Sequence, residues 1–275
     1  MMKNIFVTGS FDNLRSQHIR LLDEAAKLGT LTVYLWSDAT VERLTGQLPK
    51  FPLGERLYIL NAIRYVSHVE ICRDEAIQAN SLPGLNGTQP AVWVVDEASD
   101  NPSKWDFCQQ RGLEYVVITE DRLRVFPEWN PKEQYQANTQ KKVIVTGCFD
   151  WLHSGHVRFF EEVSGLGELY VGVGHDANLK LLKGEGHPLF PEAERRYMVQ
   201  SIRYVKEALI TSGHGWMDAE PEIERVGIDA YAVNEDGDKP EKRAFCVDHG
   251  LEYIVLKRTP AAGLPRRQST DLRGF

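Results

Sequence analysis

The chain repeats itself after about 138 residues, and this repeat limits its possible folds more than any other feature. Shifted by 138 positions, residues 5–46 match residues 143–184 at 18 of 42 positions without a gap. Further on, FPLGERLYILNAIRYV aligns with FPEAERRYMVQSIRYV, and FCQQRGLEYVVI aligns with FCVDHGLEYIVL. Three matching blocks in the same order predict two copies of one domain.

A polar stretch between the two copies predicts the domain boundaries. The segment PEWNPKEQYQANTQ contains two prolines and shows little periodicity, which is typical of a linker. We therefore expect a first domain at residues 1–126, a linker at 127–140 and a second domain at 141–275.

Composition limits the partners of these domains. The 275 residues are 42% hydrophobic and carry a net charge of −7, which suits two soluble domains and argues against a broad nucleic-acid surface. No run of 18 apolar residues occurs, so we expect no membrane span. The four cysteines form no C-x-x-C pair and no zinc pattern, and together with the absence of a signal-peptide pattern they favour a cytoplasmic location.

Each copy alternates strand patterns with helix patterns. Buried strands in sequence order with intervening helices predict a parallel sheet covered on both faces, so we expect two Rossmann-like, doubly wound α/β domains. In the second copy we expect strands at 142–147, 168–174, 207–211, 228–234 and 252–258, and helices at 156–167, 191–202, 220–227 and 242–250.

The stretch GCFDWLHSGH, residues 147–156, is expected at the first strand–turn–helix junction. A helix N-terminus offers unpaired N–H groups and a positive dipole end to a phosphate. His153 and His156 are three residues apart on the first turn, and both can donate hydrogen bonds to a phosphate or to its more charged transition state. Gly155 between them leaves room for a close approach.

Other interpretations of this stretch remain open. The two histidines are ordinary surface residues in one alternative and zinc ligands in another, although no third ligand has suitable spacing. Cys148 is a nucleophile in principle, because a helix N-terminus lowers a thiol pKa. Its counterpart in the first copy is Ser10, which favours a small residue in a turn.

GCFDWLHSGH resembles the G-x-F-D-x-x-H-x-G-H signature of the cytidylyltransferase branch of the nucleotidyltransferase superfamily. That branch contains glycerol-3-phosphate, choline-phosphate and ethanolamine-phosphate cytidylyltransferases. LLKGEGHPLFPEAER resembles its lysine-bearing loop, IRYVKEALI its R-Y-V-D-E-V-I segment, and KRTPAAGLPRRQSTDLR a stretched R-T-x-G-I-S-T motif. The resemblance covers nearly the whole chain, twice.

The resemblance implies transfer of CMP from CTP to a small phosphomonoester, such as a phosphorylated alcohol, amino alcohol or sugar, with release of pyrophosphate. It implies Mg²⁺ bound with the CTP triphosphate, and catalysis by positioning and charge stabilisation. His153, His156 and Lys183 would be the catalytic residues. The nucleotide would be bound by Gly147, Cys148, Phe149, Asp150, Gly155, Arg203, Arg258, Thr259, Ser269 and Thr270.

Several of these roles have alternatives. Asp150 either fixes the turn or lies near Mg²⁺. Lys183 either binds phosphate or is an ordinary loop lysine exposed to solvent. Arg203 has a surviving counterpart, Arg64, so a structural role is at least as well supported. Ser269 and Thr270 would cap a final helix.

The sequence also departs from the family pattern. Relative to the compact motif, six extra residues precede Ser269 and add Arg266 and Arg267, which either bind an anionic acceptor or lie in solvent. The acidic segment after the fourth strand is altered at Asn234 and Glu235, so recognition of the base and the acceptor stays open.

The first copy keeps the fold pattern and loses the phosphate-handling residues. Arg15 replaces the first histidine, Gln17 the glycine and Thr45 the lysine, and the R-T…S-T element is missing. We therefore expect no catalysis there, whereas binding of an anion by Arg15, and with it the sensing of a ligand, stays open. We propose that this copy pairs with the second as an intramolecular pseudo-dimer; a homo-oligomer remains open. The rival functions are an adenylyltransferase that uses ATP and a non-catalytic nucleotide-binding regulator.

Overall fold

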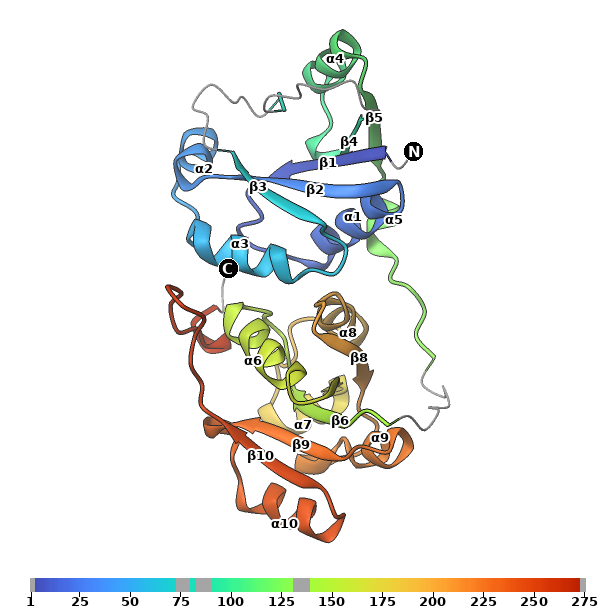
Figure 1. Ribbon diagram of the computed structural model, residues 1–275, viewed down its shortest axis with the longest axis vertical. Helices are drawn as coiled ribbons and strands as arrows, with labels where there is room; N and C mark the ends of the chain where they lie inside the picture. The colour runs from blue at the N-terminus through green and yellow to red at the C-terminus, as the bar shows by residue number, and fades with distance from the viewer. Residues whose placement is uncertain (1–2, 73–79, 83–90, 131–138, 273–275) are drawn as a thin grey trace. The chain divides into compact units, whose positions relative to one another are not determined.

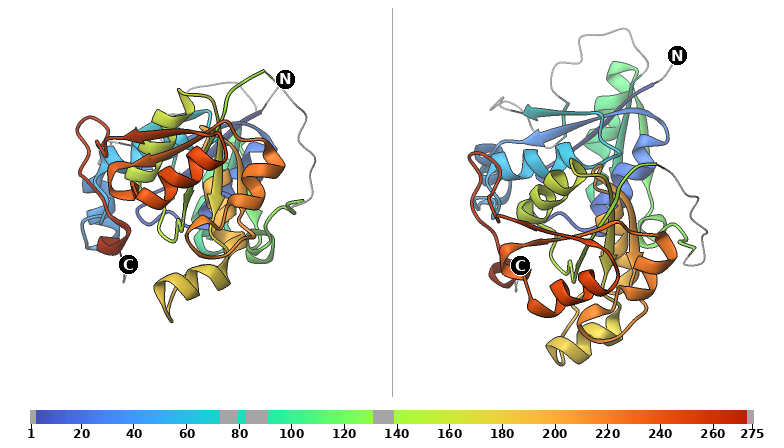
Figure 2. Two further views of the ribbon diagram at one scale, coloured as in Figure 1. Left: turned by 90° about the horizontal axis from the view of Figure 1, so that it is seen from below. Right: turned by 60° about the horizontal axis from the view of Figure 1, so that its bottom comes forward.

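The chain forms two compact units, Met1–Phe126 and Pro127–Phe275, each built on one parallel five-stranded sheet (Figure 1). The computed structural model describes residues 3–72, 80–82, 91–130 and 139–272. Helices lie on both faces of each sheet (Figure 2), so the expected pair of doubly wound α/β domains is confirmed.

The first unit follows the expected alternation of strands and helices. Its order of elements is β1 Lys3–Gly9, α1 Ser16–Ala26, β2 Gly29–Trp36, α2 Asp38–Thr45, α3 Leu53–Ala62, β3 His68–Cys72, β4 Ala91–Asp96, η1 Glu97–Ser99, α4 Pro102–Arg111, β5 Glu114–Ile118 and α5 Glu120–Arg124.

The second unit also alternates strands with helices, and all nine elements expected there are present. They are β6 Lys142–Gly147, α6 Ser154–Ser164, β7 Glu168–Val173, α7 Asp176–Lys183, α8 Glu192–Gln200, β8 Val205–Ile210, η2 Gly215–Met217, α9 Glu220–Val226, β9 Ala230–Asn234, η3 Glu235–Gly237, α10 Pro240–Asp248, β10 Glu252–Leu256 and η4 Ser269–Leu272.

The strand order creates one switch point in each sheet. The sheets run β3-β2-β1-β4-β5 and β10-β9-β6-β7-β8, so the chain first moves outward on one side of β1 or β6 and then crosses to the other side. Ligands of such sheets bind at the carboxyl ends of the strands where this direction reverses. The switch points lie between β1 and β4 and between β6 and β9.

Both faces of the central strands are buried, which explains their continuous apolar sequences. Ile144 and Tyr231 pack on one face with α9 and α10, while Val143 and Val145 on β6 face the opposite way and are at most 1% exposed. On α6, the predicted apolar face is confirmed, because Val157, Phe160 and Val163 are all buried.

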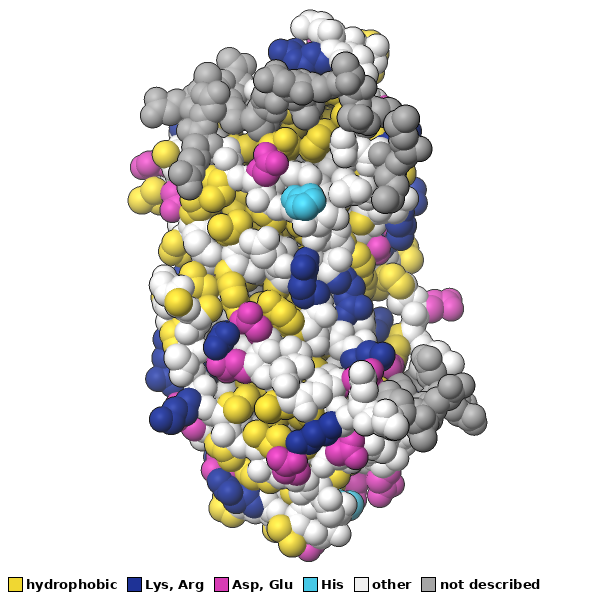
Figure 3. Space-filling model, in the orientation of Figure 1, with side chains coloured by type: hydrophobic (Ala, Val, Ile, Leu, Met, Phe, Trp, Pro, Cys, Tyr) yellow, Lys and Arg dark blue, Asp and Glu magenta, His cyan; other side chains and the backbone are white. Residues whose placement is uncertain are grey.

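Three further features of the chain bear on the sequence expectations. All four cysteines are unpaired, as expected. No helix in the described part of the chain is long and apolar enough to cross a membrane. On the face shown in Figure 3, basic and acidic side chains are interspersed instead of forming one broad basic surface.

The segment expected to be a linker begins with residues that pack on the second unit. Trp129 donates a hydrogen bond from Nε1 to Glu207 Oε1 at 3.3 Å. The Arg196 guanidinium lies 5.5 Å from the centre of the Trp129 ring. Residues 131–138 of the expected linker lie outside the described residues.

Candidate active site

The turn after β6 is held by a phenylalanine in an unusual backbone conformation. Phe149 has φ 54°, in the left-handed region, and its ring lies over Gly147. A Cβ on Gly147 would be 2.8 Å from that ring, so only glycine fits there. The same ring meets His156 edge to face, with 5.2 Å between ring centres. The turn therefore fixes the position of His156.

His153 caps the start of α6 with its own ring. Its Nδ1 accepts a hydrogen bond from the Gly155 N–H at 3.1 Å, so in the neutral ring the proton is on Nε2. That Nε2 lies 3.4 Å from Ser269 Oγ. The ring is 1% exposed and stacks on His156 with ring centres 3.9 Å apart. The two predicted histidines thus form one stacked pair.

Both imidazoles are held neutral. Burial, with help from Arg258, lowers the pKa of His156 to about 4. Burial, followed by His156 and Arg258, also lowers the pKa of His153. The Nδ1 of His156 is buried and has no hydrogen-bond partner in the described part of the chain, while a hydrogen bond with the Trp151 backbone acts against the lowering of the His156 pKa. Each neutral ring carries one N–H group and no charge, and in His153 that N–H is on Nε2.

A basic cleft adjoins the histidine pair. It begins at Gly155, near the helix N-terminus that favours an anion, and runs along the side of α6 that carries Arg158 and Glu162. Arg258 donates from Nη2 to the Arg267 carbonyl at 2.8 Å and pairs with Asp236. These contacts tie the chain after β10 to the wall of the cleft. The lining includes Gly155, Arg158, Lys257, Arg258, Thr259, Arg266 and Arg267.

Lys183, Ser269 and Thr270, which were also predicted to bind phosphate, lie on two other elements. Lys183 ends α7 and is exposed, and its charge is among the causes that lower the pKa of His156. A loop was expected to carry this lysine, but His175 caps a helix there by accepting from the Asn178 N–H. Ser269 and Thr270 begin a short 3₁₀ turn, η4, instead of a longer helix.

The Asp150 carboxylate fixes a loop. It accepts hydrogen bonds from the Leu189 N–H at 2.9 Å and the Phe190 N–H at 3.1 Å. In the first unit, Asp12 accepts in the same way from the Lys50 and Phe51 N–H groups, at 2.8 Å each. Of the two roles left open for Asp150, the structure favours the fixing of the turn and loop.

Cys148 has the environment of a structural residue. Its carbonyl accepts a hydrogen bond from Arg195 Nη1 at 2.7 Å, and burial raises the pKa of its thiol. A protonated thiol is a weak nucleophile, so the small-residue interpretation is favoured.

The structure does not bring Arg203 to this site, which corrects the prediction that it binds the nucleotide there. Arg203 directly precedes the amino end of β8, whereas His153 follows the carboxyl end of β6. Since the two strands are parallel members of one sheet, these ends lie at opposite edges. The matching Arg64 in the first copy already pointed to a structural role.

Sequence reasoning missed Arg195, which organises the whole turn. Its guanidinium is 1% exposed and donates to the carbonyls of Phe190, Cys148 and Gly174 at 2.7–2.8 Å, and it also pairs with Asp176 at 2.6 Å. Arg56 makes the equivalent contacts in the first unit. The shared Glu-Arg of the two aligned helices was the available signal.

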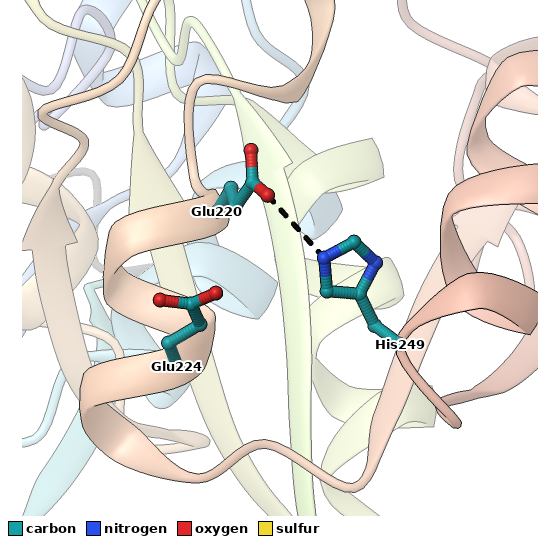
Figure 4. Close-up of side chains that lie close together, drawn as sticks. All are labelled: Glu220, Glu224 and His249. Atoms are coloured by element: carbon teal, nitrogen blue, oxygen red, sulfur yellow. Dashed lines mark ion pairs between the residues drawn. The ribbon is translucent and has the colours of Figure 1, made fainter.

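One cluster in the described residues has the composition of a metal site. Glu220 and Glu224 of α9 lie close to His249 (Figure 4), and their ligand atoms are within 4.8 Å of one another. The Glu220–His249 ion pair at 3.3 Å accounts for this closeness. All three side chains are exposed and none lines the basic cleft, so the cluster is separate from the histidine pair.

The switch-point location, the helix N-terminus and the basic cleft together define a nucleotide-binding class of α/β protein. The chain belongs to the cytidylyltransferase-like family, whose model matches residues 6–146 and 144–239. The predicted resemblance is therefore confirmed at the level of this family.

The relatives that match this chain carry different names. The FAD synthase of Methanocella paludicola is 31% identical over 137 residues, which are 48% of this chain and 93% of that protein. The bifunctional protein HldE of Helicobacter pylori is 31% identical over 96 residues, 34% of this chain, and the match spans only 21% of HldE. A lipopolysaccharide core biosynthesis protein from Thermoplasma volcanium has a solved structure with TM-score 0.37 and 24% identity, covering 47% of this chain and 99% of that one.

Proposed function

We propose that the second unit transfers CMP from CTP to a small phosphomonoester and releases pyrophosphate. The observation that supports this most is the stacked, neutral His153–His156 pair at the start of α6, beside a cleft lined by basic side chains. Neutral N–H donors next to arginines suit a polyphosphate, because the arginines balance its charge while the imidazoles orient it.

In the proposed step, a phosphate oxygen of the acceptor forms a new bond to the α-phosphorus of CTP. The bond from that phosphorus to the bridging oxygen breaks in line, and the electron pair leaves with pyrophosphate. His153 and His156 would donate to the phosphate oxygens, and Arg258 would bind the leaving phosphates. Lys183 would approach from the end of α7. No covalent enzyme intermediate is needed.

Mg²⁺ would enter with the nucleotide, bound to its phosphate oxygens. Both oxygens of Asp150 already accept backbone N–H groups, so this carboxylate is engaged in holding residues 189–190. Asp236 is paired with Arg258. We therefore assign no protein carboxylate to the ion.

ATP is the second candidate donor, and one observation favours it. Relatives that match this chain are named FAD synthase, and FAD contains an adenosine moiety. The R-Y-V and R-T segments of this sequence favour CTP. Because Arg258 and the histidine pair would contact phosphates common to both nucleotides, these residues do not discriminate between them.

A pyrophosphate-release assay would test the proposal. Wild-type protein with Mg²⁺ is given CTP or ATP and a panel of phosphomonoesters; CTP-dependent release is the expected result, and ATP-only release would overturn the choice of donor. His156→Ala should lower kcat by about 100-fold or more, the effect of losing one transition-state donor. His18→Ala, at the matched position of the first unit, is the control and should leave turnover unchanged. Nucleotide binding without turnover for every acceptor would instead support a regulator.

Arg266 and Arg267 are the best placed residues for an anionic group on the acceptor. Both line the cleft next to Arg258, and their sequence position lies within the six-residue extension. Replacing Arg266 with Ala should raise KM for the acceptor more than KM for CTP. Equal effects on both would argue for contact with the nucleotide.

A further inference from the structure

The first unit keeps a cavity at its own switch point, although it has lost the phosphate-handling residues. The cavity lies at the carboxyl ends of β1 and β4 and measures about 170 Å³. Its lining includes Phe11, His18, Trp36, Asp96 and Lys104. This is the place where a doubly wound sheet binds its ligand.

His18 supplies a defined hydrogen-bond donor to this cavity. Its Nδ1 accepts from the Arg15 N–H at 3.0 Å, which leaves the proton of the neutral ring on Nε2. Burial lowers the pKa of His18, so the ring is neutral near pH 7. The Phe11 ring meets it edge to face at 6.0 Å and fixes its orientation, as Phe149 does for His156.

Asp96 and Lys104 add one negative and one positive group. Asp96 Oδ1 accepts from the Ser99 N–H at 2.7 Å, and the Lys104 ammonium donates to the Ser99 carbonyl. Lys104 is 7% exposed, and burial lowers its pKa. An ammonium has three N–H groups and a carboxylate two oxygens, so each keeps capacity for a ligand. The cavity thus offers both hydrogen-bond donors and an acceptor. The charges of Asp96 and Lys104 cancel.

The walls and the size of the cavity suit one flat ring. Trp36 and Phe11 contribute aromatic surface, and Leu21 occupies the position that Phe159 has in the second unit. A cavity of about 150 Å³ holds a benzene-sized ring, so about 170 Å³ fits a one-ring base better than a two-ring base.

The first unit does not offer the second unit's groups for a triphosphate. Glu120 stands where Arg258 stands, and Ala98 stands where the partner of Arg258, Asp236, stands. The backbone contact is nevertheless preserved, since Glu120 N–H donates to Glu97 at 2.6 Å just as Arg258 N–H donates to Glu235 at 3.4 Å. The backbone therefore follows the same path in both units, but the first unit has a negative Glu120 where the second has a positive Arg258.

We propose that the first unit binds a pyrimidine nucleoside, such as cytidine or uridine, at this cavity. The base edge, which carries both donors and acceptors, would meet Asp96, Lys104 and the Nε2–H of His18. Trp36 and Phe11 would contact the ring. This site does not depend on the chemistry proposed for the second unit.

Titration of the full chain with cytidine, uridine and adenosine would test this. Binding is followed by calorimetry and by tryptophan emission. The emission change that is lost in Trp36→Phe is the signal from this cavity. We expect cytidine and uridine to change the Trp36 emission and adenosine to bind at least about tenfold more weakly. Lys104→Met should weaken cytidine binding about tenfold or more, as loss of a charged donor does. Lys242→Met, at the matched position of the second unit, should leave the Trp36 signal intact.

Leu21→Phe gives an independent test that changes no charge. It copies the residue of the second unit, fills part of the cavity and should abolish the Trp36 response. Unchanged Trp36 emission up to about 5 mM cytidine and uridine would overturn the proposal. Equal binding of adenosine, or unaltered cytidine binding in Leu21→Phe, would overturn it as well. If Lys104→Met does not fold, Leu21→Phe decides.

Discussion

His156 is held neutral by burial and by the nearby Arg258, and this determines how it can act on a phosphate. A neutral imidazole donates a hydrogen bond without adding charge, so the arginines alone must balance the phosphates. An anion bound beside it favours the protonated ring and should raise its pKa.

A histidine titration followed by NMR tests this directly. In the free protein the His156 ring should titrate near pH 4, and addition of CTP should move the midpoint upward. Because the unfolded chain takes up the proton near its ordinary pKa of about 6.5, the free energy of unfolding should fall as the pH falls from about 6.5 to 4. A midpoint near 6.5 in the free protein would contradict the burial argument.

Gly155 and His153 depend on each other. A Cβ on Gly155 would lie 3.0 Å from the His153 ring, so the glycine makes room for the stacked imidazole as well as for any ligand. In the first unit both positions have changed together, to Arg15 and Gln17.

Gly155→Ala should therefore push the His153 ring out of its stacked position and lower kcat. Steady-state assays would measure this, with thermal unfolding to confirm that the fold is kept. Gln17→Ala, which shortens the matched exposed side chain, should change neither property. Full activity of Gly155→Ala would show that His153 does not need its observed position.

At the level of elements, an aspartate at the matched position of each unit connects a loop to the turn after the first strand. Asp150 and Asp12 both accept backbone N–H groups of the segment that precedes the next helix, α8 or α3. Asp150→Ala and Asp12→Ala should each lower the free energy of unfolding by about 1–3 kcal/mol, because two backbone N–H groups lose a charged acceptor. Chemical denaturation would measure the loss.

Only one of these two changes should affect turnover. Asp150→Ala should lower kcat, since the turn that holds His156 loosens, whereas Asp12→Ala should leave kcat unchanged at temperatures where both are folded. A stable Asp150→Ala protein that loses its Mg²⁺ dependence would instead support the metal-site alternative.

The regular elements were predictable because strands with apolar residues on both faces alternate with amphipathic helices. Helix α7 was missed, since its N-cap is His175, a residue type that rarely signals a helix start. The placement of Arg203 failed for a different reason: a motif identifies a segment but not the edge of the sheet at which that segment lies. The contacts of Arg195 join four separate segments, so only the folded chain reveals them.

At the scale of the whole molecule, one chain carries two units of the same fold with different residues at the two switch points. If the first unit acts as the intramolecular partner that we propose, catalysis needs no second chain. Sedimentation of the active protein should then give the mass of one chain, 31.3 kDa, at concentrations where turnover is measured. Activity that increases with self-association would contradict this arrangement.

The mutual dependence of Gly155 and His153 also determines which changes would rebuild a histidine pair in the first unit. In the first unit, a reversion of Arg15 to histidine alone would place the new ring against the Cβ of Gln17, judging by the 3.0 Å contact that a Cβ would make in the second unit. A reversion of Gln17 alone would gain nothing without the ring. Rebuilding the stacked pair in the first unit therefore requires Arg15→His and Gln17→Gly together, and neither change alone should alter the activity of the first unit.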